Sequence, residues 1–171
     1  MKTFTKIVVA FVFLYCTTYQ TGFTQSNIYK IHSLFLYNFT KHVQWKDFGE
    51  SFTIGVFDSD IAMNVIKENF AGKKIAGKEI RIINILEIAD ANQSQLVYMP
   101  KSNKDKILNM FEEADKDNTL FVSEDDLVDQ GFPISFVLKG TKFGFKVSKK
   151  NLEAGGLKIS TSLLSLAEVV D

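Results

Sequence analysis

The sequence predicts a single α/β domain, a sandwich in which helices flank a mixed β-sheet. Short apolar runs of strand type alternate with segments of helical periodicity through most of the chain. Residues 134–147 have the pattern of a β-hairpin, which adds antiparallel pairing to a sheet whose other strands are joined by helices. Beyond an N-terminal leader, about 146 residues remain, which is the size of one domain.

The leader, residues 1–25, is predicted to be a secretory signal peptide, and residues 26–171 the mature domain. Lys2 and Lys6 precede an apolar run over residues 7–16, which a polar stretch with small residues follows. This order is typical of an exported protein. The apolar run is about half the length of a membrane-spanning helix. We therefore expect cleavage, with a retained signal anchor as the alternative.

Cleavage would leave a slightly acidic chain without cysteine. Lys2 and Lys6 leave with the leader, so that 18 basic and 20 acidic residues remain. Cys16 is the single cysteine, so no disulfide, thiol nucleophile or cysteine-based metal site is expected in the mature protein. A chain without a basic excess is not expected to bind nucleic acid. With no second long apolar segment, we expect a periplasmic protein that does not insert into the membrane after cleavage.

The first half of the mature chain alternates helices with strands. A helix is expected over residues 27–43, with Asn27 as its N-cap. A strand at 51–57, rich in β-branched and aromatic residues, precedes a helix over 61–70. A second strand is expected at 78–86. The apolar stripe predicted to face the core from the first helix consists of Ile28, Ile31, Leu34, Phe35, Phe39 and Val43.

The next elements are shorter. Residues 96–99 and 119–122 are apolar runs of strand type, and a helix over 104–114 is expected between them. Residues 123–126 have the Ser-x-x-acid spacing of a capping box. This spacing predicts a short helix that ends at Gly131.

Residues 134–147 give the most definite local geometry. A two-residue turn at Gly140 and Thr141 would pair the flanking strands, with the glycine supplying the positive φ of a type II′ turn. In this register three apolar pairs fall on one face, which we expect to pack on the core while the opposite face meets water. The pairs are Leu138 with Phe143, Phe136 with Phe145, and Ile134 with Val147.

The last part of the chain is predicted to be helical. Residues 149–154 would form a helical turn, which Gly155 and Gly156 end. Ser160 or Thr161 would then cap a final helix that continues to residue 171. Its inward residues would be Leu163, Leu164, Ala167 and Val170.

The sequence contains no recognisable motif for catalysis or metal binding. The two histidines, His32 and His42, lie on the first helix and point about 80° away from each other, whereas zinc needs at least three converging protein ligands. No Gly-x-Ser-x-Gly elbow marks a nucleophile. We expect no cofactor and no enzymatic activity. A hydrolase built from residues distant in sequence is the alternative.

An aromatic cluster lies at the end of the first helix. Phe35 and Phe39 belong to the apolar stripe and are expected in the core. Tyr37, Trp45 and Phe48 fall off the stripe or beyond the helix. Aromatic residues in such positions either cover the core or anchor a partner protein. Both roles stay open, and these three are the candidate partner-binding residues.

Four segments of the chain resemble the YfiR family of bacterial periplasmic proteins. The first resembles the aromatic-rich helix of that family, which ends at a tryptophan, and the last resembles the family's closing segment. Together they span nearly the whole mature chain in family order. The segments are 37–45 (YNFTKHVQW), 52–57 (FTIGVF), 142–147 (KFGFKV) and 154–167 (AGGLKISTSLLSLA).

The resemblance implies an exported α/β domain without catalytic activity. The best-studied kind binds the periplasmic part of an inner-membrane diguanylate cyclase and holds it inactive, and its release raises cyclic-di-GMP and favours biofilm formation. The resemblance therefore implies a repressor of such a cyclase, with the periplasmic domain of a sensor kinase as the alternative partner. Better-known members carry disulfides, which this chain lacks the cysteines to form.

A different class of function is a small-molecule-binding module, such as a periplasmic sensor for a histidine kinase. Its ligand would lie against aromatic residues between the sheet and the first helix. Apolar surfaces on so small an exported domain also make a homodimer reasonable.

Overall fold

A computed structural model of the chain describes residues 24–170. Its helices are α2 (Gln25–His42), α3 (Asp60–Phe70), α4 (Ile88–Asn92), α5 (Lys104–Glu113), α6 (Lys149–Ala154) and α7 (Thr161–Leu164), with a 3₁₀ turn η1 (Val128–Gln130). Its strands are β1 (Val43–Gln44), β2 (Ser51–Phe57), β3 (Lys74–Ile75), β4 (Lys78–Ile85), β5 (Leu96–Met99), β6 (Leu120–Ser123), β7 (Ile134–Lys139), β8 (Lys142–Ser148), β9 (Lys158–Ile159) and β10 (Glu168–Val170).

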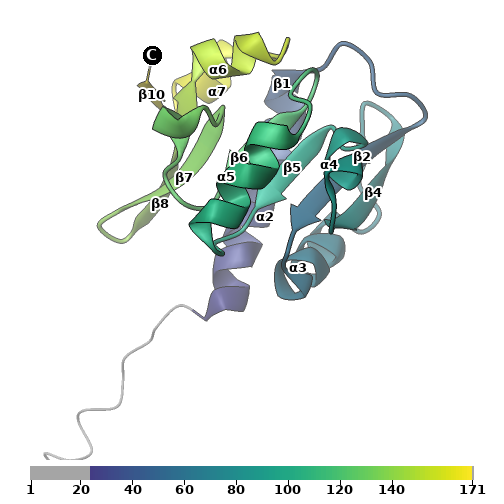
Figure 1. Cartoon of the computed structure of the whole chain (residues 1–171), viewed down its shortest axis with the longest axis horizontal. Helices are drawn as coiled ribbons and strands as arrows, with labels where there is room; N and C mark the ends of the chain where they lie inside the picture. The colour runs from purple at the N-terminus through teal and green to yellow at the C-terminus, as the bar shows by residue number, and fades with distance from the viewer. Residues whose placement is uncertain (1–23, 171) are drawn as a thin grey trace, which may run out of the picture.

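The elements form three layers (Figure 1). Eight strands make one mixed sheet in the order β10-β8-β7-β6-β5-β2-β4-β3. One apolar core joins α2 and α3 to the sheet, and a second joins α4 and α5 to its other face. The predicted single-domain α/β sandwich with a mixed sheet is therefore confirmed. The predicted signal peptide lies almost entirely outside the described residues.

The centre of the sheet is parallel. Strand β2 pairs in parallel with β4 on one side and with β5 on the other, and β6 and β7 continue the parallel order from β5. After β2 the chain adds β4 on one side of β2 and then β5 on the other side. The order in which strands are added therefore reverses at β2. In open α/β sheets, crevices form at such a point, along the carboxyl ends of the strands.

The predicted hairpin is present in the predicted register. All three apolar pairs oppose each other across β7 and β8, and Gly140 has the positive φ expected of the turn. The hairpin extends beyond the helical layers (Figure 1), so Leu138 near its tip is 60% exposed although it was predicted on the core face. The expectation for the opposite face is wrong at Ser135, which is fully buried because a second core covers that face.

The first helix is present, but its predicted N-cap is wrong and its predicted buried face is partly wrong. The helix begins at Gln25 and its N-cap is Thr24, so Asn27 lies inside the first turn. Leu34 is 57% exposed, whereas two residues with aliphatic hydroxyl groups are buried. They are Ser33 and Thr40, whose hydroxyl groups donate to the carbonyls of Lys30 and Tyr37 in the same helix. Satisfied in this way, the hydroxyl groups can face the core.

The predicted final helix is wrong after its first turn. Ser160 caps α7 as expected, by accepting a hydrogen bond from the Leu163 amide. The helix ends at Leu164, and Glu168–Val170 then forms β10, which pairs in parallel with β8. The backbone of this segment is paired with the sheet edge rather than within a helix.

Some short elements were not predicted. Strands β1, β3 and β9 have only two residues each, and α4 has five. The predicted capping box at Ser123 is also wrong: its hydroxyl donates to the Asp125 carbonyl, and only η1 forms before Gly131. A reciprocal capping box instead joins Glu87 and Asp90 at α4. No helix among residues 24–170 is long and apolar enough to cross a membrane.

Candidate functional site

The segments 37–45 and 154–167 meet at one end of the domain. Strand β1, which follows α2, pairs antiparallel with β9, and Val43 opposes Ile159. The Ser160 amide donates to the His42 carbonyl at 2.9 Å, and the Ser160 hydroxyl lies 3.1 Å from Nδ1 of His42. This two-stranded pairing fixes where the chain leaves α2, and hence where Trp45 and Phe48 begin the approach to β2.

Trp45 and Phe48 both pack on the ring of Phe52, near the start of β2. The ring centroids of Trp45 and Phe52 are 4.9 Å apart with perpendicular planes, and those of Phe48 and Phe52 are 5.1 Å apart at 81°. Nε1 of Trp45 donates to the Gln95 carbonyl at 2.9 Å. Phe52 is fully buried while Trp45 and Phe48 are half-buried. We call Trp45 and Phe48 on Phe52 the aromatic platform.

The loop that carries the platform is held to the neighbouring loop before β6. The Lys46 amide donates to Oδ1 of Asn118 at 2.8 Å, and Nδ2 of Asn118 donates to the Asp47 carbonyl at 2.6 Å. Both side chains of the nearby Lys46–Asp117 ion pair are exposed, so this pair adds little stability. The two amide hydrogen bonds thus give the loop a fixed path.

Charges also flank the platform. The amides of Phe48 and Gly49 donate to the carboxylate of Asp47, and these bonds, followed by the nearby Lys78 charge, lower the pKa of Asp47. Nζ of Lys78 lies 4.8 Å from the centroid of the Phe48 ring. The edge of the platform therefore carries both the carboxyl group of Asp47 and the amino group of Lys78.

Tyr37 lies in a different environment. Its ring meets the ring of Phe70 on α3 edge-on, with centroids 5.5 Å apart. Nζ atoms of Lys41 and Lys73 lie 4.1 and 4.3 Å from its centroid. Among the described residues, no ring contact joins Tyr37 to Trp45 or Phe48. The structure therefore brings two of the three candidate residues together and places the third apart from them.

The two histidines lie in different surroundings. His42 is half-buried beside Ser160. His32 is fully buried, which the sequence pattern did not indicate. In the part of the chain that the structure describes, no group of three His, Cys, Asp or Glu side chains could hold a metal ion.

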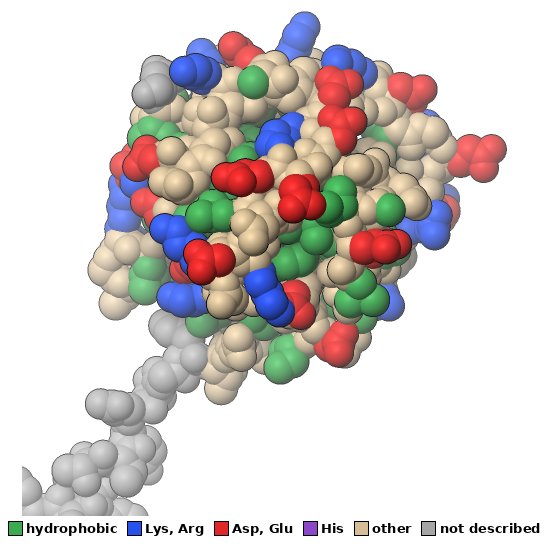
Figure 2. Space-filling view, in the orientation of Figure 1, with side chains coloured by type: hydrophobic (Ala, Val, Ile, Leu, Met, Phe, Trp, Pro, Cys, Tyr) green, Lys and Arg blue, Asp and Glu red, His purple; other side chains and the backbone are tan. Residues whose placement is uncertain are grey.

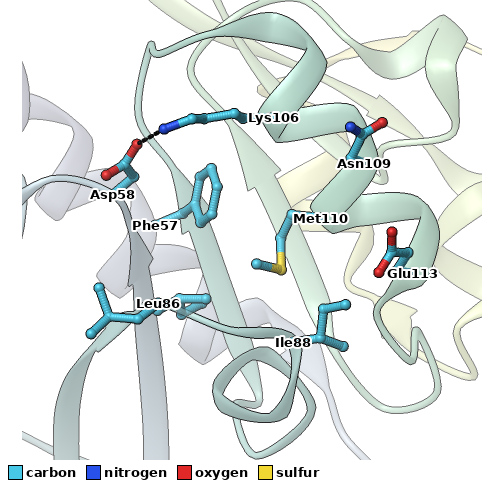
Figure 3. A pocket seen from close by; sticks show the side chains of 9 residues that line it. Phe57, Asp58, Leu86, Ile88, Lys106, Asn109, Met110 and Glu113 are labelled. Carbon is cyan, nitrogen blue, oxygen red and sulfur yellow. Dashed lines mark hydrogen bonds and ion pairs between the residues drawn. The ribbon is translucent and has the colours of Figure 1, made fainter.

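A groove of about 340 Å³ lies on the face of the sheet opposite α2, between α5 and the carboxyl ends of β2 and β4. Phe57 and Met110 point into it, and the Lys106–Asp58 ion pair, 3.5 Å long, borders it (Figure 3). Leu86 on its rim is 77% exposed. Basic, acidic and apolar side chains are mixed over this face of the molecule (Figure 2). The groove has no signal in the sequence, because its lining comes from separate segments.

Comparisons with known proteins support the fold and a family. A family model described as YfiR/HmsC-like matches residues 29–168. A crystal structure of a conserved domain protein from Vibrio cholerae O1 biovar El Tor is similar, with a TM-score of 0.58 and 14% identity. The alignment covers 84% of this chain and 60% of that one, so at this identity it shows the fold alone. A search of curated proteins found no match.

Proposed function

The chain belongs to the YfiR/HmsC-like family, whose members are periplasmic regulators of diguanylate cyclase signalling, and we propose that it restrains such a cyclase. In this proposal it binds the periplasmic part of the inner-membrane enzyme and holds it inactive. Removal of the protein then raises cyclic-di-GMP and favours biofilm formation. The family match, which extends over residues 29–168, carries the proposal.

The aromatic platform is the proposed contact surface. Trp45 and Phe48 each rest on Phe52 and remain half-buried, so each ring keeps an outer surface for a partner. Aromatic side chains that are already held in place lose little conformational freedom on binding, and Trp and Tyr are enriched among the residues that dominate protein interfaces. The hydrogen bonds of the loop through Asn118 supply this fixed arrangement.

Tyr37 is proposed as a second, separate contact. The Nζ atoms of Lys41 and Lys73 lie near its ring, so an acidic group on a partner would find two positive charges beside an aromatic surface. A partner that covers both Tyr37 and the platform would have to extend along α2.

Affinity capture from detergent-solubilised membranes tests the proposal. Tagged protein expressed in its own organism should capture a membrane protein that has a diguanylate cyclase domain. Deletion of the gene should raise the cellular concentration of cyclic-di-GMP, and expression of the unaltered chain should restore it. If neither the capture nor the change in cyclic-di-GMP occurs, the proposal is wrong.

The same experiment separates the alternative partner. Capture of a histidine kinase, with cyclic-di-GMP unchanged on deletion, would assign the protein to sensor-kinase control instead. A cavity between α2 and the β7–β8 hairpin gives that alternative a place for a small ligand.

A further inference from the structure

A cavity of about 530 Å³ lies between α2 and the β7–β8 hairpin, apart from the aromatic platform. Its apolar wall includes Ile28 of α2 with Phe136 and Phe143 of the hairpin, and its polar wall includes Lys101 and Glu124. This volume lies in the range of sites that enclose small organic molecules.

The position of the cavity in the fold is one that commonly binds ligands. Lys101 follows the carboxyl end of β5, and Glu124 follows the carboxyl end of β6 directly. These two strands are parallel neighbours. In open α/β sheets the binding crevice lies along the carboxyl ends of the strands at the point where the strand order reverses, and β5 is a direct neighbour of β2, where it reverses here.

His32 lines this cavity and has one ring nitrogen without a partner. Nδ1 of His32 lies 2.7 Å from the hydroxyl oxygen of Tyr98, and the Tyr98 hydroxyl donates to Oε2 of Glu124 at 3.2 Å. The single hydroxyl proton of Tyr98 is used in the bond to Glu124, so Nδ1 of His32 donates to the Tyr98 oxygen. Nε2 is then an acceptor, and it is buried with no hydrogen-bond partner.

The imidazole stays neutral in this environment. Burial lowers the pKa of His32 to about 4, so at neutral pH Nε2 keeps its lone pair. A buried acceptor without a donor is unfavourable and is uncommon in native proteins. A donor from a bound molecule would satisfy it after a small shift of the surrounding rings opens Nε2 to the cavity.

Aromatic rings pack against the His32 imidazole. The ring of Phe136 stacks on His32 with centroids 4.0 Å apart and planes at 2°, and the ring of Phe143 meets His32 edge-on at 5.9 Å. All three rings also line the cavity. Such a set favours a flat ring that packs against aromatic faces and edges.

The polar wall disfavours a negative charge. Asp125 pairs with Lys101 at 3.4 Å, while Glu124 accepts from Tyr98 and from the Lys101 amide and forms no ion pair with a basic side chain among residues 24–170. The wall therefore has more negative than positive charge, which repels an anion.

From these observations we propose that the cavity binds a neutral molecule of one or two aromatic rings, whose O–H or N–H group donates to Nε2 of His32. This ligand site is independent of the proposed contact with a cyclase. Either proposal can fail while the other holds.

A matched pair of probes tests the donor requirement. At neutral pH, 2-naphthol supplies two fused rings with one O–H donor, and 2-methoxynaphthalene supplies the same rings without a donor. Calorimetric titration of the full protein should show 2-naphthol binding about tenfold more tightly, the ratio that corresponds to one hydrogen bond. Only 2-naphthol should raise the melting temperature clearly, because a ligand stabilises the native state in proportion to its affinity.

A spectroscopic measurement on the unaltered protein gives a second, independent readout. The ¹⁵N resonance of Nε2 of His32 should shift when 2-naphthol is added, since the nitrogen gains a hydrogen bond. The resonances of His42, which lies at the other end of α2, should not move. This measurement does not depend on whether a variant folds.

Two variants complete the test. His32→Phe keeps a ring on Phe136 but removes the acceptor, so its affinities for the two probes should become equal. His42→Phe should keep the tenfold preference. The proposal is overturned if 2-naphthol shows no saturable binding, if the unaltered protein binds both probes equally, or if the His32 resonance stays unchanged at saturation.

Discussion

Nδ1 of His32, on the first described helix, lies 2.7 Å from the hydroxyl oxygen of Tyr98, on a central strand of the sheet. The contact crosses the interface between helix layer and sheet, where both side chains are buried. Burial, with Glu124 as the next cause, raises the pKa of Tyr98 well above its usual value. The pair is therefore neutral at physiological pH, and only His32 can change its charge under mild acid.

The stability of the fold should depend on pH through His32. Its pKa is about 4 when folded and about 6.5 when unfolded, so between these values the unfolded chain binds more protons. The stability that depends on neutral His32 is complete well above pH 6.5 and is lost as the pH drops toward 4. At pH 5 the loss from this group should be about 2 kcal/mol. Urea unfolding at pH 7.5 and pH 5.0 measures it, and His32→Phe should remove most of the difference.

Gly55→Ala should destabilise the protein strongly. A Cβ at Gly55, in the middle of β2, would lie 2.4 Å from Cδ1 of Ile85 and 2.8 Å from Oγ of Ser94. Overpacking of this kind costs about 1–3 kcal/mol. Gly144→Ala is the matched control, because a Cβ there meets only Cγ2 of Val137 at 3.8 Å. Equal melting temperatures for the two variants would contradict the prediction.

Ser135→Ala should destabilise the start of the hairpin. The Ser135 hydroxyl oxygen accepts from the Leu127 amide at 3.0 Å and lies 2.7 Å from the Ser123 hydroxyl, all in a buried place. Removal leaves the amide without an acceptor, which costs about 2 kcal/mol. Denaturant unfolding measures the loss. Ser165→Ala removes only an exposed hydroxyl and should change stability by less than about 0.5 kcal/mol.

Trp45→Ala should weaken capture of the proposed membrane partner more than it lowers the melting temperature. The Trp45 ring is half-buried, so its removal takes away only part of the packing in the core. In the proposal, the same change takes away the whole contact of this ring with the partner. Capture should fall by at least about tenfold, the scale of an interface residue that dominates binding. Ile61→Ala, at an exposed apolar residue on α3, should leave capture unchanged. A large loss of stability with normal capture would assign Trp45 to the core alone.

Local patterns predicted the parts of the fold that local interactions decide. The β7–β8 hairpin needs only alternation and a glycine that accepts positive φ, and both are visible within fourteen residues. The helical segments in the middle of the chain likewise follow from their own periodicity. In these segments the requirements of the local sequence and of the whole fold agree.

The errors come from interactions between distant residues. Glu168–Val170 has helical spacing with the residues before it, yet its backbone completes the edge of β8. The buried face of α2 includes Ser33 because the hydroxyl group is satisfied within the helix, which hydropathy cannot show. Short strands such as β1 carry too few residues for a periodic signal.

The candidate sites were predicted only in part. Trp45 and Phe48 could be singled out as aromatic residues beyond the helix, but their shared support, Phe52, lies on the next strand. A ligand between the sheet and the first helix was one expectation from the sequence, but nothing in the sequence singled out His32, because Tyr98 lies on β5 and Glu124 follows β6. A single histidine on a helix becomes informative only when the sheet beside it is known.

The pairing of β1 with β9 has a consequence for the order of folding. Val43 lies near the start of the domain and Ile159 near its end, so this contact closes a loop that contains most of the described chain. Loops of that length close late, after nearer contacts have formed, and they slow folding. The end of α2 therefore acquires its final support in one of the last steps. A chain that is synthesised from its N-terminus cannot complete the surface around Trp45 until its last strands have been made.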